Sequence, residues 1–427
     1  MQIVKVPQLA WFGPREFEFP LPEDWQVKMC HMDGYNSPEL RPEEIRQALR
    51  EPMGTRPLSE IAKGKKEVVI VFDDLARVTR AARIVPVVLE ELAAAGIPDD
   101  NIRFICGLGL HGVMYRSDLA KKLGEEVVSR FQVFNHNAFG NCAYVGTTTT
   151  FKTRVHINEE YLKCDLRILI GACVPHPLAG FGGGSKLILP GIASCETISW
   201  HHRAGGLTPD TITGSNKPVK GMGLIEDNPF KKDIDEAAEL AGVDFLINSV
   251  VNLWGESMAV YSGEWKLSYA AALERAKKHY ATPMVWDQDI VISNSYAKAS
   301  ESLISMQVAM PMLSSKGGDI VVIANAPEGQ VPHYLISPFG KTTYASQYVP
   351  CQIPAHIHKV IAFTEYPHRG SSWFGQNQKI TYLSQWDRVV QYLRETHGAG
   401  TRVAVIPDAT NQFFLQPGIS TSGTRPA

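Results

Sequence analysis

The sequence predicts an α/β fold made of two α/β domains with mainly parallel sheets, and three observations support this prediction. Near-continuous apolar runs such as Glu67–Phe72 and Leu166–Val174 are typical of strands buried on both faces of a parallel sheet. Amphipathic segments of helical period separate these runs. The alternation stops at 281–283 and restarts at 290, so we expect domains at 1–280 and 285–427, with the active site in the interdomain cleft.

In the first domain, the predicted helices have recognisable start or stop signals. Pro42 suits the first turn of a helix, where its missing N–H costs least, and Ser117 is a good N-cap. Several of the helical segments end at glycine. The helices expected are 42–49, 84–95, 117–123, 228–242 and 267–280, with a polar, glycine-rich loop at 214–227. The strands expected are 67–72, 101–106, 127–133, 143–150, 166–174 and 244–251.

The second domain repeats the alternation over a shorter length. Its expected strands are 290–293, 319–324, 358–363 and 402–406, and its expected helices are 301–313 and 386–397. Functional loops of such folds lie at the carboxyl ends of the strands, so residues that directly follow a strand are the first candidates for a site.

Composition narrows the class of partner. The 427 residues include 42 basic and 44 acidic side chains, a balance that favours a small-molecule partner over a nucleic acid or an anionic membrane. The N-terminal residues lack the pattern of a signal peptide, and no apolar run is long enough to cross a bilayer, so we expect a cytoplasmic protein. Seven scattered cysteines without a Cys-x-x-Cys pair argue against a disulfide framework and a thiolate zinc site.

The residues 175–186 follow a predicted strand and are poor in core-forming side chains. Three consecutive glycines, Gly182, Gly183 and Gly184, suit a backbone that bends unusually or lies against a ligand. A phosphate-loop pattern fails here, because Ser185 replaces its second glycine and Leu187 its magnesium-binding Ser/Thr.

A second glycine pattern at 107–112 matches the dinucleotide signature and follows a strand. The next helix starts several residues late, and no acidic residue ends the following strand. An NAD site at this loop therefore remains a rival hypothesis.

The lysine and histidine side chains near the glycines could have more than one role. Lys186 could contact a phosphate, join covalently to a carbonyl or cofactor, or be a surface lysine at a turn. His201 and His202 point about 100° apart on a helix, so one could face a site as a metal ligand, although core or surface histidines are commoner.

Four further side chains follow strands at the same edge of the predicted sheet. His111 and His176 could act as paired general acid and base, since imidazole titrates near neutral pH, or could be turn histidines. Asp74 and Arg77 leave another strand end, where arginine can grip a carboxylate with two hydrogen bonds. An ordinary surface ion pair would have the same sequence pattern.

Five segments together resemble the lactate racemase (LarA-like) family, whose members use a nickel-pincer nucleotide. Asp73–Arg77 resembles the family's Asp-Asp-x-Thr-Arg segment, and Pro175–Ala193 resembles its longest motif. Thr197–His202, Asp227–Pro229 and Asn252 continue the similarity. The resemblance covers most of 68–252 and is thinner beyond about 285.

The resemblance implies how the cofactor is held. Lys186 corresponds to the lysine that holds the pyridinium-3,5-dithiocarboxylic acid mononucleotide covalently, with the glycines 182–184 beside it. His202 corresponds to the protein ligand to nickel. Proteins that build the cofactor would be transient partners.

The resemblance also implies the reaction. A 2-hydroxy acid substrate would be oxidised by hydride transfer to the cofactor, giving a transient 2-keto acid, and the hydride would return to either face. His111 and His176 correspond to the two acid/base residues, Asp74 to a partner that orients one of them, and Arg77 to the residue that holds the substrate carboxylate.

The chain departs from the lactate racemases at several positions. Ala76 replaces a threonine, Gly182 replaces the serine of Ser-Gly-Gly, and Met306–Met310 replaces the Tyr-Gln-x-x-Lys segment, keeping only Gln307 for the substrate. These changes suggest a hydroxy acid other than lactate, larger or more polar. Trp373 is the candidate aromatic against the cofactor ring, and a core tryptophan is the alternative.

Three hypotheses follow from the sequence. The first is a nickel-pincer racemase or epimerase of a 2-hydroxy acid, and the second is an NAD-dependent oxidoreductase. The third is a non-catalytic carboxylate-binding protein with the same fold.

Overall fold

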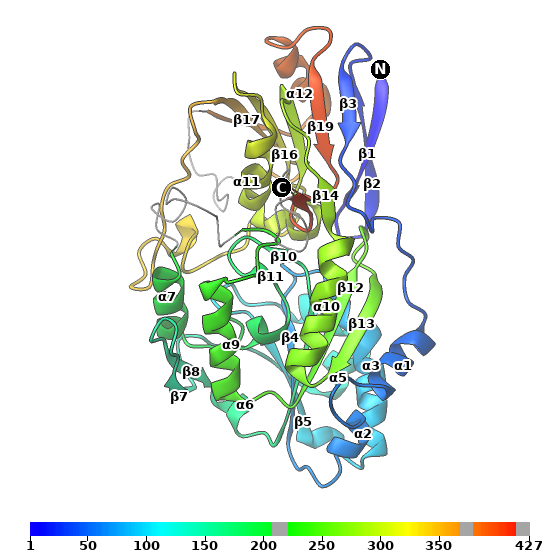
Figure 1. Ribbon diagram of the computed structural model, residues 1–427, viewed down its shortest axis with the longest axis vertical. Helices are drawn as coiled ribbons and strands as arrows, with labels where there is room; N and C mark the ends of the chain where they lie inside the picture. The colour runs from blue at the N-terminus through cyan, green and yellow to red at the C-terminus, as the bar shows by residue number, and fades with distance from the viewer. Residues whose placement is uncertain (207–220, 368–378, 416–427) are drawn as a thin grey trace, which may run out of the picture.

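The computed structural model describes residues 1–206, 221–367 and 379–415, and two six-stranded sheets form its two halves (Figure 1). The first sheet has the order β13-β12-β9-β4-β5-β6, and all neighbours are parallel except the edge strand β13. Its strands are β4 (Val68–Asp73), β5 (Ile102–Gly107), β6 (Gln132–Asn135), β9 (Leu166–Ala172), β12 (Phe245–Val251) and β13 (Ser257–Gly263). The predicted α/β class with mainly parallel sheets is confirmed.

Both faces of the first sheet are buried, as the apolar strand sequences predict. Alternate residues of β4 enter two cores, with Val69 and Val71 in one and Val68, Ile70 and Phe72 in the other. The helices over the second core are α1 (Pro42–Arg50), α2 (Leu58–Ile61), α3 (Ala81–Ala94), α4 (Arg116–Leu123) and α5 (Glu125–Arg130). Those over the first are α6 (Glu159–Leu162), α7 (Cys195–Ala204), α9 (Pro229–Ala241) and α10 (Trp265–His279).

The second sheet is parallel throughout, with the order β18-β17-β16-β15-β19-β3. One face packs against α11 (Leu303–Ala309), and the other against α12 (Trp386–Arg394) and the hairpin β1 (Gln2–Gln8) with β2 (Arg15–Leu21). The strands are β3 (Gln26–Met29), β15 (Ile290–Asn294), β16 (Gly318–Ile323), β17 (Ile357–Phe363), β18 (Ile380–Leu383) and β19 (Arg402–Ile406).

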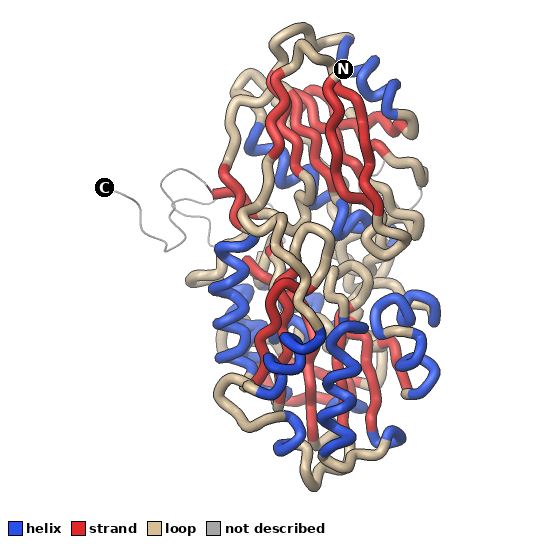
Figure 2. The backbone as a smooth tube through the Cα atoms, turned by 90° about the vertical axis from the view of Figure 1, so that its right-hand side faces the viewer, coloured by secondary structure: helices blue, strands red, loops and turns tan. Residues whose placement is uncertain are grey.

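The N-terminal residues belong to the second sheet's half of the molecule. β3 pairs with β19, and the N-terminus lies in that half of the molecule (Figure 2). Phe19 and Leu21 of β2 are fully buried against the second sheet. The range 1–280 expected for the first domain therefore begins with a segment that packs on the other half. No local signal in this segment distinguishes the two sheets, because its alternating apolar residues could cover either.

Short elements complete the described chain. The two-stranded pairs are β7 (Cys142–Thr147) with β8 (Arg154–Asn158), β10 (Pro175–His176) with β11 (Gly180–Phe181), and β14 (Ala281–Pro283) with β20 (Phe413–Leu415). The 3₁₀ turns are η1 (Asp99–Asn101), η2 (Gly184–Leu187), η3 (Tyr296–Glu301), η4 (Met310–Met312) and η5 (Pro338–Gly340). No helix in the described ranges is long and apolar enough to span a membrane.

One strand prediction was wrong in its position. The residues 127–133 were expected to form a strand, but α5 extends to Arg130 and the strand β6 starts only at Gln132. Glu125 and Glu126 in the first turn and Arg130 in the last complement the helix dipole, and this charge pattern outweighs two β-branched valines. The expected loop 214–227 lies partly outside the described residues.

Candidate active site

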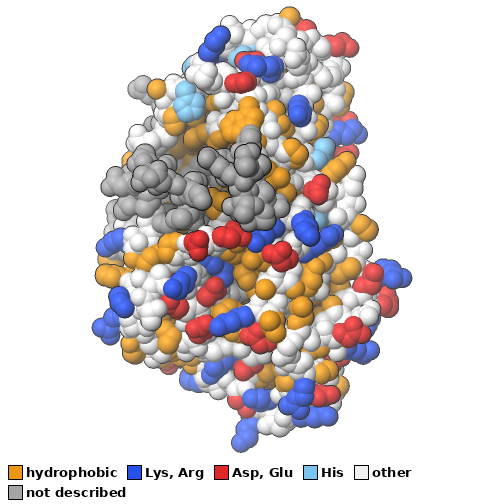
Figure 3. Space-filling view, in the orientation of Figure 1, with side chains coloured by type: hydrophobic (Ala, Val, Ile, Leu, Met, Phe, Trp, Pro, Cys, Tyr) orange, Lys and Arg blue, Asp and Glu red, His pale blue; other side chains and the backbone are white. Residues whose placement is uncertain are grey.

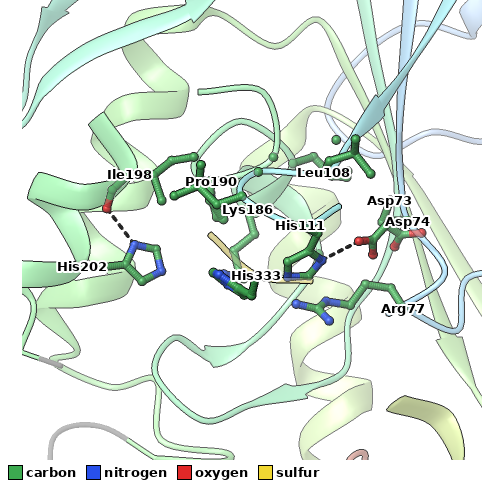
Figure 4. A pocket seen from close by; sticks show the side chains of 16 residues that line it. Asp73, Asp74, Arg77, Leu108, His111, Lys186, Pro190, Ile198, His202 and His333 are labelled. Carbon is green, nitrogen blue, oxygen red and sulfur yellow. Dashed lines mark hydrogen bonds and ion pairs between the residues drawn. The ribbon is translucent and has the colours of Figure 1, made fainter. Parts of the chain in front are cut away.

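A cavity of about 620 Å³, counting its open mouth, lies where the two halves meet (Figure 4). Its walls come from segments that follow β4, β5 and β9, from α7 and from a loop of the second half. The lining residues fall within 73–77, 107–111, 183–202 and at His333. The carboxyl ends of parallel strands therefore supply most of the site, as expected for this class of fold.

A chain of buried charges crosses one wall of the cavity. Asp74 Oδ2 lies 2.5 Å from His111 Nδ1, and Arg77 Nη1 donates a hydrogen bond to Glu301 Oε2 at 2.8 Å. Glu301 Oε1 lies 3.6 Å from His111 Nε2, so the imidazole stands between two carboxylates. The four side chains are at most 19% exposed. Asp74, Arg77 and His111 were predicted from the sequence, whereas Glu301 was not.

These contacts change the proton affinities in opposite directions. Burial by itself lowers the pKa of His111, but the carboxylates of Asp74 and Glu301 outweigh it and raise that pKa above its ordinary value. Burial disfavours ionised Asp74, yet its pKa is lowered because His111 and then Arg77 stabilise the carboxylate. His111 is therefore a stronger base than a free imidazole.

The loop between Asp73 and Arg77 is fixed from below by a buried lysine. Lys122 Nζ donates to Asp73 Oδ1 at 2.5 Å and to the carbonyls of Arg77 and Thr79 at 2.9 and 3.1 Å. Asp73 also accepts a hydrogen bond from Thr79 Oγ1 at 2.6 Å. Lys122 thus anchors the backbone that carries Arg77.

The second half contributes His333 to the cavity. Residues 110–112 and 332–334 form an antiparallel bridge, in which Gly112 N donates to Pro332 O at 2.8 Å and Tyr334 N donates to Leu110 O at 2.9 Å. The His333 ring meets the His111 ring edge to face, with centroids 4.9 Å apart. This long-range pairing brings His333 to the site. The residues around His333 in the sequence did not indicate a functional role for it.

Lys186 stands in the cavity wall as a buried amine. Its side chain belongs to η2, and the residue is 9% exposed. Burial, followed by the nearby cations Arg77 and Lys231, lowers the pKa of Lys186 to about 7. Within the described parts of the chain, no hydrogen bond or ion pair engages its Nζ atom. About half of such amines are neutral near pH 7, and a neutral amine is a nucleophile.

The glycines before Lys186 are required by close packing. Gly183 has φ of +72°, and a Cβ atom there would lie 2.7 Å from the Ala172 carbonyl oxygen. Gly184 has φ of +55°, and a Cβ atom would lie 2.6 Å from the Tyr269 ring. Gly183 also lines the cavity, whereas Gly182 and Gly184 do not. The glycine run therefore turns the backbone sharply and lets η2 lie on β9 and β12.

His202 presents one nitrogen to the cavity. Its Nδ1 lies 2.9 Å from the Ile198 carbonyl oxygen, which makes Nδ1 the donor and leaves Nε2 with a lone pair (Figure 4). Burial, and then the neighbouring His201, holds the pKa of His202 well below its ordinary value. His201 points away, fully buried, with Nδ1 2.8 Å from Asp233 Oδ2. As the helical geometry predicts, the two side chains point in different directions: His202 faces the cavity and His201 faces the core.

His176 lies outside the cavity lining, at the end of β10, where it pairs with Gly180 of β11. Its Nδ1 accepts hydrogen bonds from the backbone N–H groups of Leu178 and Ala179 at 3.2 and 3.1 Å. Burial, and then the charges of Lys186, Arg77 and Lys298, lowers the pKa of His176 far below its ordinary value. It therefore lies within electrostatic range of the site and carries its proton on Nε2.

Of the two second-half residues expected from the sequence, only Gln307 lies within the described residues. Gln307 is exposed on α11 and is absent from the cavity lining, and Trp373 lies outside the described residues. Lys298 is buried instead, and its Nζ donates to the carbonyls of Pro175 at 3.2 Å and Thr410 at 3.0 Å. Burial lowers the pKa of Lys298 to about 8. The sequence did contain a signal here: Lys298 and Glu301 are the two charged residues of a segment made mainly of Ala and Ser.

No group of three or more His, Cys, Asp or Glu side chains in the described ranges is arranged to hold a metal ion.

Comparison with known proteins finds similarity to lactate racemases. Residues 12–214 match the lactate racemase N-terminal domain. The lactate racemase of Lactiplantibacillus plantarum is 28% identical over 301 residues, which cover 69% of this chain and 68% of the relative. The lactate racemase of Thermoanaerobacterium thermosaccharolyticum is 26% identical over 326 residues, which cover 74% of each.

Solved structures share the fold. The lactate racemase apoprotein from Thermoanaerobacterium thermosaccharolyticum superposes with a TM-score of 0.72 at 21% identity, over 97% of this chain and all of the other. A protein from Thermotoga maritima superposes with a TM-score of 0.64 at 19% identity, over 88% and 99% of the two chains. On the sequence matches, the chain is similar to lactate racemases and is an isomerase of the racemase and epimerase class. The solved structure shows that it shares their fold.

Proposed function

We propose that the protein is a racemase or epimerase of a 2-hydroxy acid, which acts through a transient 2-keto acid and uses a nickel-pincer nucleotide joined covalently to Lys186. One observation carries the proposal. A buried lysine amine without a carboxylate partner in the described chain shares a cavity with a histidine whose Nε2 is open and with the strongly basic His111.

The residues present fit such a cofactor. The Lys186 amine, with its pKa near 7, is suited to form a covalent bond, and His202 Nε2 offers the one protein ligand that nickel would need beside ligands from the nucleotide. Gly183 leaves the wall beside Lys186 without a side chain. When bound, the nucleotide would supply a site that accepts hydride from the substrate carbon and returns it.

The chain's own residues supply the proton chemistry in this proposal. Asp74 holds the His111 Nδ1–H, so His111 Nε2 is directed to accept the proton of the substrate hydroxyl. His176 corresponds to the acid/base residue of the opposite face. Because its Nδ1 accepts two backbone N–H groups and its pKa is lowered, its Nε2–H would donate a hydrogen bond to the substrate oxygen there. Arg77 would bind the substrate carboxylate with the donors that Glu301 does not use.

The dinucleotide pattern at 107–112 packs closely against Pro190 and Gly191. Gly109 N donates to the Gly191 carbonyl at 2.9 Å, and a Cβ atom at Gly109 would lie 3.2 Å from Pro190. The helix that follows, α4, starts only at Arg116, so no helix N-terminus directly follows the glycines.

The experiment that tests the proposal is intact-mass spectrometry with elemental analysis. Protein produced together with the enzymes that build the cofactor should carry a covalent adduct at Lys186 and about one nickel per chain. Lys186→Met should remove the adduct, whereas His202→Ala should keep the adduct and lose nickel. Lys266→Met, on the exposed side of α10, is the matched lysine control and should keep both.

Two outcomes would contradict the proposal. Full racemisation by protein without an adduct would remove the cofactor from the reaction. Binding of 2-hydroxy acids by adduct-bearing protein, without any inversion, would instead indicate the carboxylate-binding alternative.

A further inference from the structure

We propose that Glu301 contacts the substrate and selects 2-hydroxy acids that carry a second hydroxyl on the neighbouring carbon. This inference rests on the proposed function and concerns the substrate class. Glu301 is 5% exposed, and its carboxylate lies between the two residues that the reaction needs, Arg77 and His111.

The two carboxylate oxygens of Glu301 have different surroundings. Oε2 accepts the hydrogen bond from Arg77 Nη1 at 2.8 Å. Oε1 lies 3.6 Å from His111 Nε2, beyond hydrogen-bond distance, and no donor in the described part of the chain reaches it. A carboxylate oxygen with spare accepting capacity in a largely buried residue is a favourable acceptor for a ligand hydroxyl or a water.

The open oxygen stands beside the atom that would take the substrate proton. A 2-hydroxyl at His111 Nε2 and a 3-hydroxyl at Glu301 Oε1 would use two acceptors 3.6 Å apart, a spacing that suits the adjacent oxygens of a vicinal diol. A methyl or aromatic group at the same position would leave Oε1 desolvated and unpaired. Sites built to receive a hydroxyl reject analogues that lack it for this reason.

The turn that carries Glu301 is held on both sides. Lys298 Nζ bonds to the carbonyls of Pro175 and Thr410, and the backbone leaves helical geometry at Lys298, with φ −128° and ψ 51°. On the other side, the Ser302 backbone N–H and hydroxyl donate to Gln330 Oε1 at 3.0 and 2.6 Å. The carboxylate is therefore preorganised rather than free to swing away from an apolar substrate.

Glycerate and lactate test the proposal, because they differ only in the 3-hydroxyl. The cofactor-loaded wild-type enzyme should racemise glycerate with a kcat/KM at least about tenfold above that for lactate, as expected for a hydrogen bond to a charged acceptor. Glu301→Gln, which keeps the shape and removes the charge, should reduce that ratio about tenfold. Glu91→Gln is the control. Glu91 is a buried residue of α3 in the first half, and it pairs with Arg50 of α1.

Isothermal titration of the same proteins with glycerate and lactate gives a second readout that does not require turnover. Equal affinity for the two acids in the wild type, or an unchanged preference in a folded Glu301→Gln variant, would overturn the role of Glu301. If the loaded enzyme inverts no 2-hydroxy acid, the proposed function fails, and the titrations still decide whether Glu301 recognises the hydroxyl.

Discussion

The pair Asp74–His111 offers the sharpest test of how the site is built. Asp74→Asn keeps the size of the side chain and removes the charge 2.5 Å from His111 Nδ1. With the carboxylate gone, burial dominates, so the pKa of His111 should fall below its ordinary value. Without the carboxylate, the hydrogen on His111 Nδ1 is no longer fixed, so Nε2 is no longer kept as the acceptor for the substrate proton. The rate of racemisation should therefore fall by about 10²-fold or more.

The magnitude follows from burial. The two side chains are 8% and 11% exposed, so solvent screens the pair little. A buried charge-assisted hydrogen bond contributes about 1.5–3 kcal/mol to the free energy of unfolding. The variant should be less stable by about that amount at the pH where both groups are charged.

The pH dependence of this loss is predictable. The pKa of His111 is raised, so its contribution is fully present below about pH 6.5 and is lost as the pH rises through the raised value. The pKa of Asp74 is lowered, so its contribution is present above about pH 3.9 and is lost as the pH falls through the lowered value. The difference between wild type and variant should be largest between about pH 4 and 6.5.

The assay combines urea denaturation at pH 5.5 and pH 9 with an NMR titration of the His111 imidazole nitrogens. Asp319→Asn is the matched control, because Asp319 pairs with His397 at 2.9 Å with 2% and 13% exposure, away from the cavity. It should lower stability without moving the His111 titration. An unchanged His111 pKa in Asp74→Asn, or an equal stability loss at both pH values, would refute the reasoning.

Two further substitutions probe the supports of the site. Lys122→Met leaves buried Asp73 without its cation and should lower the free energy of unfolding by about 3–5 kcal/mol in the same denaturation assay. Lys121→Met is the control. It removes a partly exposed ion pair with Asp118 and should lower the free energy of unfolding by about 1 kcal/mol or less. Gly183→Ala should cost more than the roughly 1–2 kcal/mol of a left-handed alanine and prevent the Lys186 adduct, since the added Cβ meets a backbone carbonyl. Gly400→Ala has a similar φ of +79° and open space, so melting should show only the smaller loss and mass spectrometry an intact adduct.

Surface charges have little effect on these predictions. Basic and acidic side chains are interspersed over the face seen in Figure 3, in keeping with the balanced composition. The charges that matter for function are therefore the buried ones at the cavity, which respond to their immediate partners rather than to the overall field.

The positions of the first-half candidates could be predicted because each depends on a local rule. Asp74 directly follows β4, and His111 lies in the loop after β5; parallel strands bring such residues to one edge. His202 follows from helical spacing, which separates it from His201 by about 100°. Lys186 was singled out by the glycines before it, whose close contacts the structure now explains.

The second-half contacts could not be predicted in the same way. Gln307 was chosen because its neighbours resembled a family segment, yet it is exposed on α11, whereas Glu301 at the end of η3 reaches Arg77. Helix phase and the kink at Lys298 decide which of these residues points inward. His333 reaches His111 only through a backbone bridge between distant segments.

By itself, the sequence determined most of the long strands and helices, the parallel arrangement of the first sheet, and the segments that carry Asp74, His111, Lys186 and His202. These features depend on periodicity, capping and glycine geometry, which act within a few residues. The tertiary structure alone decided that β3 joins the second sheet, that His333 lines the cavity and that Glu301 reaches Arg77 and His111. Such contacts depend on how two separately buried cores meet, and no short stretch of sequence contains that information.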